Sequence, residues 1–327
     1  MKTSVIIPVY NVFDYLEKCI NSVTRLNADI EILLVDDGSI DGSSNLCDKI
    51  AETDSRIKVI HQENGGLSAA RNTGIKHSTG DYLLFIDSDD FIETTETEKI
   101  LNELDGETEV YMGLYRCYYS LEDKFEEENC EAFLKLHGKT DINSFLDVVP
   151  KNGQSCYMTA WRFIVKKEFV LENKLFFFEG IYHEDEEWTH RLFCCCKSVF
   201  VSHYFFYNYR QNREGAITAT IKPKHLLDSI LIIERANSLS ATLEANTVKF
   251  IYLRQRMSNK YLDIMINLYS VPKEQRNEIF KKLLSLYDDC KKRITGKIGF
   301  IAKILLTFCG LRNTCYILNR LKKFFGR

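Results

Sequence analysis

The sequence has few of the residues that divide a chain into separate pieces. It contains 4 prolines among 327 residues and no low-complexity run, so we expect no long flexible linker. Its 11 cysteines are odd in number, and Cys194, Cys195 and Cys196 are consecutive. That spacing suits neither a disulfide framework nor a zinc site of paired C-x-x-C motifs. We therefore expect buried free thiols in a reducing cytosol.

Signals for export and membrane insertion are scarce. Met1, Lys2 and Thr3 lead directly into an apolar strand pattern, which leaves no room for a signal peptide. The longest apolar stretch near the end, residues 298–311, is interrupted by Lys303 and is shorter than the ~20 residues of a spanning helix. The sequence therefore predicts a cytoplasmic protein.

Acidic residues are absent after Asp289, whereas ten basic residues follow it. The whole chain has a net charge of −3, but residues 1–290 carry 33 basic against 46 acidic residues, a net charge of −13. An acidic body with a basic, aromatic-bearing tail favours contact with the inner face of an anionic membrane over nucleic acid. The alternative is a tail helix packed on the sheet domain with its basic face in solvent. An oligomer is compatible with either interpretation.

Apolar runs and helical periodicity alternate over the first 105 residues. Short apolar runs at residues 4–9, 31–35, 57–60 and 82–86 predict buried strands. Helical patterns lie between them, the first marked by Leu16 and Ile20. This alternation predicts an α/β fold with a mostly parallel, Rossmann-like sheet and flanking helices.

The pattern loosens after residue 105 and is purely helical from Pro223 onward. We expect a sheet domain over residues 1–215 and a helical C-terminal region with a basic amphipathic tail over residues 216–327. The sheet domain divides at about residue 105 into halves 1–105 and 106–215. In the second half we expect strands at 109–119, 159–165 and 199–209, helices at 141–149 and 184–196, and a surface excursion at 122–131.

Polar clusters follow three of the predicted strands, at residues 8–11, 35–39 and 87–90. Ligands of open α/β sheets bind at the carboxyl ends of the strands, where loops and helix N-termini converge. Helix capping explains Asp41, but not five carboxylates across two loops, which repel unless a cation or donor groups compensate them. Asp87 and Asp89 therefore predict a Mg²⁺ or Mn²⁺ site with open positions for phosphate oxygens.

Four segments, in order, carry a family resemblance. They are residues 5–11 (VIIPVYN), 35–39 (VDDGS), 64–74 (NGGLSAARNTG) and 80–90 (GDYLLFIDSDD). Together they resemble the start of the family 2 glycosyltransferases with the GT-A fold, strongly to about residue 95 and more weakly to about 210. The resemblance implies an inverting enzyme that moves a sugar from a nucleotide diphosphate, commonly UDP, to a hydroxyl. A glycan or lipid-linked acceptor in surface polysaccharide synthesis fits a cytoplasmic enzyme with a membrane-seeking tail.

Carried over position by position, the resemblance assigns donor binding to Pro8, Tyr10, Asp37, Ser68, Arg71, Asp87, Ser88 and Asp89. It implies that Asp37 faces the base. Asp89 is expected to ligate the metal directly, with Asp87 near the ribose or a metal-bound water. The start of a helix near residue 67 is expected to offer free N–H groups. For Arg71, a structural ion pair inside the sheet domain is an equal alternative.

A second acidic motif lies at residues 180–188 (GIYHEDEEW). It resembles the family's Glu-Asp motif at a helix start. Inversion requires the acceptor hydroxyl to attack from the face opposite the diphosphate, and a nearby carboxylate can take its proton. We assign Asp185 as this base, with Glu184 and Glu186 as alternatives, because acids at a helix start often only complement the helix dipole.

Aromatic and basic residues give weaker signals. Trp161 and Trp188, together with Glu184, are assigned to the acceptor site, and core packing is the alternative for both tryptophans. Arg210 and Arg213 either close over the diphosphate or lie in a solvated loop, which is the interpretation we prefer.

Three rival functions are weighed against this pattern. A sugar-phosphate nucleotidylyltransferase needs a Gly-rich basic loop after the first strand, where this chain has residues 8–11. A dinucleotide-dependent oxidoreductase needs G-x-G-x-x-G there, and this motif is missing. A non-catalytic sugar-nucleotide-binding relative is disfavoured by the presence of Asp87, Asp89 and Asp185.

Overall fold

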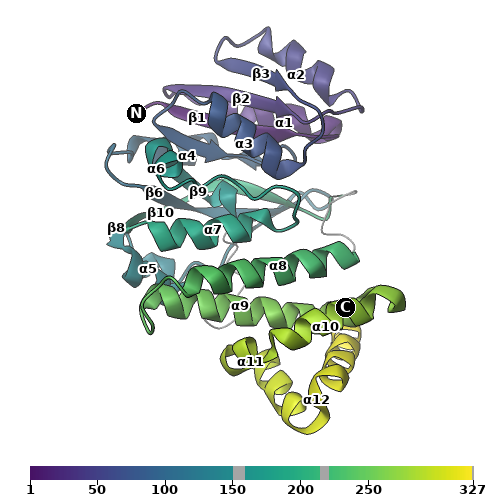
Figure 1. The fold of residues 1–327 in the computed structure, drawn as a ribbon. Helices are drawn as coiled ribbons and strands as arrows, with labels where there is room; N and C mark the ends of the chain where they lie inside the picture. Colours follow the sequence, from purple (N-terminus) through teal and green to yellow (C-terminus); the bar gives the residue numbers. More distant parts are fainter. Residues whose placement is uncertain (150–158, 214–220, 326–327) are drawn as a thin grey trace. The chain divides into compact units, whose positions relative to one another are not determined.

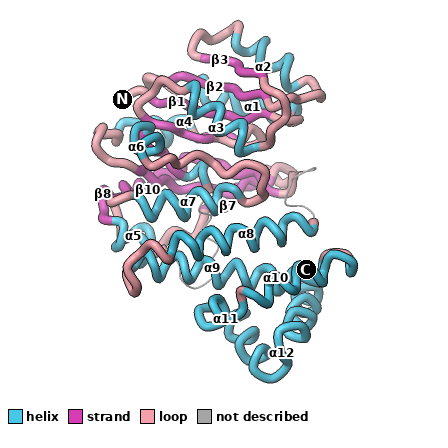
Figure 2. The backbone as a smooth tube through the Cα atoms, in the orientation of Figure 1, coloured by secondary structure: helices cyan, strands magenta, loops and turns pink. Residues whose placement is uncertain are grey.

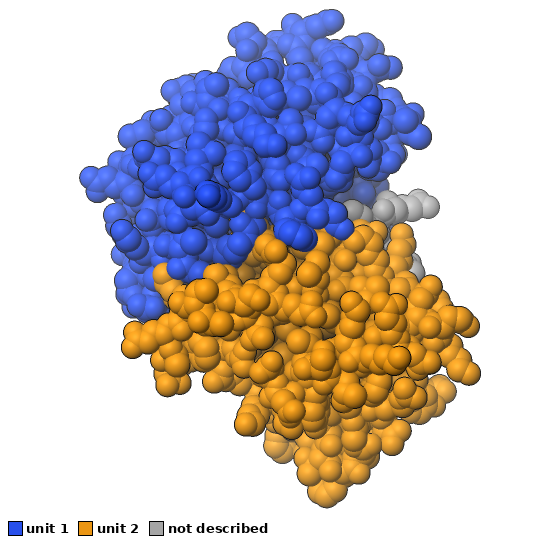
Figure 3. All heavy atoms as spheres, in the orientation of Figure 1, with its two compact units in different colours: residues 1–145, 157–180, 191–214 blue, residues 146–156, 181–190, 215–327 orange. Residues whose placement is uncertain are grey.

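The chain forms two compact units in a computed structural model that describes residues 1–149, 159–213 and 221–325. The first unit takes residues 1–145, 157–180 and 191–214, and the second takes 146–156, 181–190 and 215–327 (Figure 3). The boundary predicted near residue 215 lies outside the described residues. The second unit includes residues 181–190, which carry the predicted base Asp185.

The first unit is built on a single sheet (Figure 1), which has ten strands in the described residues. The strand order is β3-β2-β1-β4-β9-β6-β10-β5, with β7 beside β6 and β8 beside β10. The bounds are β1 Thr3–Val9, β2 Ile30–Asp36, β3 Ile57–His61, β4 Tyr82–Phe85, β5 Phe91–Ile92, β6 Val110–Tyr119, β7 Lys124–Glu127, β8 Gly138–Asp141, β9 Phe163–Lys166 and β10 Ser198–Gln211.

The first half of this sheet is parallel, as the alternating pattern predicts. β3, β2, β1 and β4 pair side by side in parallel, and α1 (Phe13–Thr24), α2 (Ser43–Ala51) and α3 (Leu67–His77) connect them. Beyond β4 the sheet is mixed, because β9 runs antiparallel to both β4 and β6, whereas β6 and β10 are parallel. The carboxyl ends of β1, β2 and β4 therefore meet at one edge.

Several short elements escaped the sequence patterns. They are β5, β8, α4 (Thr94–Asn102) and α6 (Lys167–Glu172). The strand expected at 159–165 starts as a 3-10 turn, Ala160–Arg162, before β9. The expected surface excursion contains β7, whose residues are all exposed although the strand pairs with β6. β5, β8 and α6 have two to six residues and are too short to show a period in the sequence. α4 has nine residues, of which only Ile100 and Leu101 are apolar.

Burial in the first unit follows the predicted periodicity. α1 buries Leu16, Cys19, Ile20 and Val23, and these side chains join the apolar residues of β1, β2 and β4 in one core. The ten cysteines in the described residues are all free thiols, as expected. Two helices of the second half follow the patterns too, α5 at Ile142–Val148 and α7 at Glu184–Cys195.

In the described residues of the second unit, all regular secondary structure is helical (Figure 2). Its helices beyond residue 220 are α8 (Pro223–Ser240), α9 (Val248–Asn267), α10 (Lys273–Ser285), α11 (Tyr287–Cys290) and α12 (Gly296–Phe325). They enclose a core of their own that includes Leu226, Ile233, Tyr261, Leu283 and Cys315. The helical periodicity expected from Pro223 onward is confirmed.

α12 has a sharp bend at Gly310, visible in Figure 1. Gly310 has φ 70° and ψ 168°, a backbone conformation that glycine reaches without strain. By length and mean hydropathy (1.3), Gly296–Phe324 is apolar enough to cross a membrane. The sequence analysis did not predict this, because it considered only the shorter apolar stretch at residues 298–311. The bend divides it into arms of about 14 residues, each ~21 Å long, shorter than a ~30 Å bilayer core.

Gly74 lets α3 pack closely on β1. A methyl group added at Gly74 would lie 2.3 Å from Cγ2 of Ile6, well inside van der Waals contact. The close approach also brings Arg71, one turn earlier on α3, to the carboxyl edge of the sheet.

We predict that Gly74→Ala destabilises the protein by about 1–3 kcal/mol through overpacking, which outweighs the gain of ~1 kcal/mol in helix propensity. The urea midpoint measures this change. Lys76→Ala, on the exposed side of the same helix, should stay within ~0.5 kcal/mol of wild type. In the double variant Gly74→Ala/Ile6→Ala the loss of stability should be smaller than the sum of the losses in the two single variants. Strict additivity of the two losses would contradict this account.

Candidate active site

The loops after β1 and β2 hold each other in place. Asn11 has φ 50°, and its backbone N–H donates to Oγ of Ser39 at 3.2 Å. Its side-chain Oδ1 accepts from the backbone N–H of Ile40 at 2.9 Å. Two of the three predicted polar clusters therefore lie together at the carboxyl edge of the sheet.

Asp37 organises the glycine loop before α3. Its buried carboxylate accepts hydrogen bonds from the backbone N–H groups of Gly65 (2.9 Å) and Gly66 (2.8 Å) and from Nε2 of Gln62 (2.6 Å). These two N–H groups are therefore bonded within the protein, whereas the free N–H groups expected from the helix start near residue 67 stay a prediction. A contact between Asp37 and a nucleotide base stays a prediction.

Ser68 and Arg71 connect α3 to its surroundings. Ser68 Oγ donates to the carbonyl of Phe178 at 2.9 Å. The Arg71 side chain is almost fully buried, and its Nη2 lies 2.7 Å from Oδ1 of Asp87. The ion pair weighed as an alternative for Arg71 is therefore present, and its partner is a residue of the candidate metal site.

Residues 87–90, here called the aspartate loop, follow β4 directly. The Tyr207 hydroxyl accepts from the backbone N–H of Asp87 at 3.1 Å and donates to Oδ2 of Asp90 at 2.8 Å. Arg210 donates from its backbone N–H to Oδ1 of Asp90 and from Nε to the carbonyl of Asp89, each at 2.7 Å. The end of β10 therefore holds both ends of the aspartate loop.

Arg210 and Arg213 do not form the solvated loop that we preferred. Arg210 is only 9% exposed and binds the aspartate loop as described. Nε of Arg213 lies 3.2 Å from Oδ2 of Asp89. The solvated interpretation is wrong because it considered only the neighbours of each arginine in the sequence. The pairing of β10 in the sheet brings both arginines close to the carboxylates of the aspartate loop. Tyr207 and Gln62 are further members of the site that the sequence did not reveal.

The carboxylates of the aspartate loop repel one another. Burial, together with Asp89 and Asp87, raises the pKa of Asp90 well above its usual value. Burial and Asp87 also raise the pKa of Asp89, although Arg213 and Arg210 oppose this. A nearby cation would relieve this repulsion, so the loop suits a divalent metal electrostatically.

The number of ligands limits how such a metal would be held. In the described part of the chain, no group of three or more His, Cys, Asp or Glu side chains could hold a metal ion. Asp87 and Asp89 supply two hard oxygen ligands, the kind that Mg²⁺ and Mn²⁺ accept when phosphate oxygens and water complete the shell. The residues therefore fit a metal shared with a diphosphate.

The remaining donor-site candidates lie at the same edge of the sheet. Pro8 is buried in β1 beside Val35 of β2, and Tyr10, just after the strand, is 49% exposed. Ser88 is buried within the aspartate loop. The exposed Tyr10 ring is the one of these three that offers a face to a ligand.

The two tryptophans pack in the interior. Trp161 is 2% exposed and stacks on Tyr207, with ring centroids 4.3 Å apart. Trp188 is 0% exposed. Neither ring has a free face for a sugar, so the acceptor role expected for them is corrected to core packing. Through Tyr207, Trp161 supports the aspartate loop indirectly.

The predicted base lies in the first turn of α7, within the second unit. Asp185 is partly exposed, and its Oδ1 accepts from the backbone N–H of Glu186 at 2.8 Å. Glu184 is only 8% exposed. A base must reach its substrate, and of these two carboxylates Asp185 is the more accessible.

The sheet order and the helices on its faces define a GT-A-like fold. The model of "Glycosyl transferase family 2" matches residues 4–197, and the chain belongs to this family. The match ends shortly after α7, so it covers the donor-site motifs and the acidic helix start but not α8 to α12.

Two relatives illustrate the similarity in sequence. Glycosyltransferase GlyA of Streptococcus pneumoniae is 27% identical over 346 residues, which cover 99% of this chain and 47% of GlyA. The uncharacterized glycosyltransferase EpsJ of Bacillus subtilis is 33% identical over 223 residues, which cover 67% of this chain and 64% of EpsJ. The chain thus spans less than two thirds of either relative.

A solved structure is similar over the whole chain. The crystal structure of S. aureus TarS 1-349 in complex with UDP-GlcNAc superposes with a TM-score of 0.75 at 19% identity. The superposition covers 100% of this chain and 93% of that one. At this identity the likeness shows a shared fold, including a helical region after the sheet.

We predict that Asp89→Ala abolishes sugar transfer while the protein stays folded. Without this carboxylate, Mn²⁺ and UDP should no longer stabilise the protein. At 100 times the dissociation constant such binding contributes about 2.7 kcal/mol, measurable as a thermal shift. Asp81 is exposed and lies at the opposite end of β4. The variant Asp81→Ala should keep both the activity and the thermal shift. A full Mn²⁺-dependent shift in the Asp89 variant would remove Asp89 from the metal site.

Proposed function

We propose that the protein is an inverting glycosyltransferase that moves a sugar from a UDP-sugar to a hydroxyl of a glycan or lipid-linked acceptor. The observation that carries the proposal is the aspartate loop, which holds two accessible carboxylates at the carboxyl edge of a parallel sheet. The complex of the similar TarS with UDP-GlcNAc supports a UDP-sugar as donor. A surface polysaccharide as the product is consistent with the cytoplasmic location that we propose.

The donor half of the reaction depends on charge at the departing diphosphate. A bound Mg²⁺ or Mn²⁺ would neutralise the negative charge that develops there. Asp87 and Asp89 would hold this ion, and Arg71 would keep Asp87 oriented through its 2.7 Å contact. Arg213 pairs with Asp89, and its guanidinium would be released to the diphosphate if Asp89 held the ion.

The acceptor half requires a base. We assign Asp185 as the group that accepts the proton of the acceptor hydroxyl while the hydroxyl oxygen bonds to the anomeric carbon. The bond from that carbon to the β-phosphate oxygen breaks at the same time, and UDP leaves. Because attack and departure occur on opposite faces, the anomeric configuration inverts.

We predict that Asp185→Asn lowers kcat at least 100-fold, within the ~10²–10⁴ range of a general base, with little change in UDP affinity. The acidic limb of the pH–rate profile should disappear with it. The test uses UDP release from UDP-GlcNAc, UDP-glucose and UDP-galactose, with Mn²⁺ and with chelator. Wild-type rates in this variant would exclude Asp185 as base, and release of pyrophosphate would favour a nucleotidylyltransferase.

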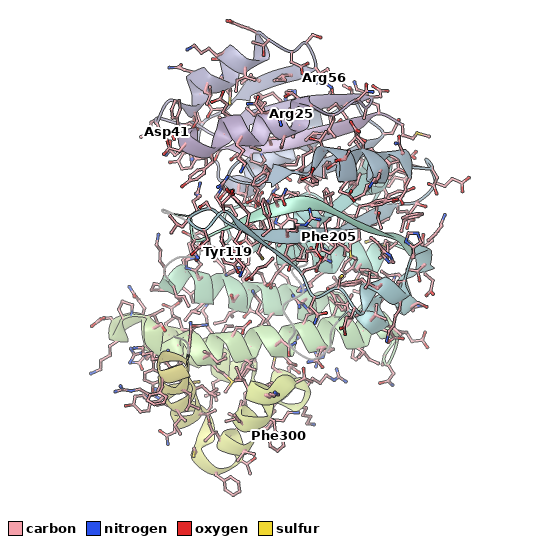
Figure 4. The ribbon with its side chains drawn as sticks, turned by 180° about the vertical axis from the view of Figure 1, so that it is seen from behind. Arg25, Asp41, Arg56, Tyr119, Phe205 and Phe300 are labelled. Atoms are coloured by element: carbon pink, nitrogen blue, oxygen red, sulfur yellow. The ribbon has the colours of Figure 1, made fainter. Side chains whose placement is uncertain are left out.

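We also propose that α12 rests on the inner face of an anionic membrane. One side of the helix contributes Ala302, Leu306 and Leu311 to the core of the second unit. Its other side leaves large apolar side chains in solvent, namely Ile298, Phe300, Ile301, Ile304, Phe308, Tyr316 and Phe324. Phe300 is labelled in Figure 4.

Charge and shape support this contact. The exposed basic residues of the two arms are Lys297, Lys303, Arg312, Arg320, Lys322 and Lys323, and the sequence of this helix contains no acidic residue. A shallow hollow on the second arm is lined mainly by apolar surface, and Arg320 and Lys323 are among its lining residues. Since neither arm is long enough to span a bilayer, the arrangement suits a helix pair lying in the interface.

We predict that the double variant Phe300→Ser/Phe308→Ser lowers binding to phosphatidylserine-containing vesicles about tenfold or more, because a buried Phe side chain contributes ~1.5–3 kcal/mol. Co-sedimentation measures it. The matched control is Leu121→Ser/Leu134→Ser, two exposed apolar residues of the first unit. Equal binding to neutral vesicles, or unchanged binding of the Phe variant, would contradict the membrane assignment.

A further inference from the structure

The first turn of α7 concentrates negative charge. Glu184, Asp185, Glu186 and Glu187 are four consecutive acids there. The positive end of the helix dipole favours acids at this position by ~0.3–1 kcal/mol each, but neighbouring carboxylates also repel one another. Other groups must therefore compensate part of this charge.

Two helices beyond the family match provide cationic partners. Nζ of Lys260, on α9, lies 2.7 Å from Oε2 of Glu186. The guanidinium of Arg235, on α8, contacts Oε1 of Glu187 through Nε at 2.9 Å and Nη2 at 2.8 Å. All four residues belong to the second unit.

α8 also holds the residues that lead into α7. Oδ2 of Asp228 accepts from the backbone N–H of Tyr182 at 2.8 Å. The Tyr182 ring stacks on His225 with centroids 4.1 Å apart and planes at 10°. The segment is therefore fixed before the helix begins and again within its first turn.

The pair between Glu186 and Lys260 is partly buried, with the Glu186 side chain 29% exposed. Lys260 is 8% exposed. Burial alone would raise the pKa of Glu186, but Lys260, Arg256 and His183 outweigh it and hold that pKa well below its usual value. Buried ion pairs add little net stability, because desolvation offsets their attraction. Their directional contact does restrict how the helix can rotate.

Helix geometry relates these contacts to the proposed base. Successive residues are separated by roughly 100° around a helix, so Asp185 lies about 100° from Glu186 and about 160° from Glu187. Two anchors on adjacent residues define the rotation of the turn about its axis. They leave Asp185 directed away from Arg235.

We propose that Lys260 and Arg235 are positioning residues that set the orientation of Asp185 through Glu186 and Glu187. This inference rests on the proposed function of Asp185 as base. The helical unit would thereby control the rate of transfer without touching donor or acceptor.

The test compares Lys260→Met with Arg254→Met. Arg254 is also on α9 and partly buried, but it pairs with Asp289 rather than with α7. For Lys260→Met we expect kcat for UDP release to fall tenfold or more, with UDP affinity unchanged. Hydrogen exchange in residues 181–190 should rise, and Lys260→Arg should recover part of kcat. Arg254→Met should show neither effect beyond its own change in Tm.

Two outcomes would overturn the inference. One is a kcat within twofold of wild type in Lys260→Met. The other is that kcat falls with Tm to the same extent in Lys260→Met and Arg254→Met, without faster hydrogen exchange at residues 181–190. That result would indicate general destabilisation. If Asp185→Asn is inactive while Lys260→Met is normal, only the positioning role fails. If Asp185→Asn is active, both the assignment of Asp185 as base and the positioning role fail.

Discussion

The site depends on the compensation of negative charge where β4 ends. Asp87, Asp89 and Asp90 lie within four residues, and burial and mutual repulsion raise the pKa values of Asp89 and Asp90. Such a loop is stable only if the rest of the fold supplies donors and cations. Nearly every contact described around it, from α3 on one side to the end of β10 on the other, has this effect.

The same constraint explains why the compensating groups are not interchangeable. Arg71 is almost fully buried and holds Asp87 firmly, whereas Arg213 pairs with an Asp89 carboxylate that is 30% exposed. Tyr207 binds the loop with a neutral hydroxyl. The buried contacts preserve the shape of the loop, and the exposed one is the contact that a metal and a diphosphate can replace at least cost. A preorganised loop of this kind needs little rearrangement when a ligand binds.

Sequence patterns predicted the elements whose signals are local. The apolar strands, the helix marked by Leu16 and Ile20, and the four family motifs depend on short spacings, and they located the aspartate loop correctly. The contacts of Tyr207 and Arg210 span about 120 residues and follow irregularities in the pairing of β10 with β6 between Val201 and Tyr207. A shift of one residue in a strand reverses which face each side chain occupies, so no periodicity along the chain could have predicted these partners.

The acidic start of α7 extends the argument beyond the family motifs. The family match ends at residue 197, yet the cations that contact Glu186 and Glu187 come from positions 260 and 235. An acidic motif does not determine its own orientation, because a single helix turn can rotate unless side chains elsewhere hold it. With Asp185 as the proposed base, changes in the helices that follow the family domain would alter transfer while every family motif stays intact.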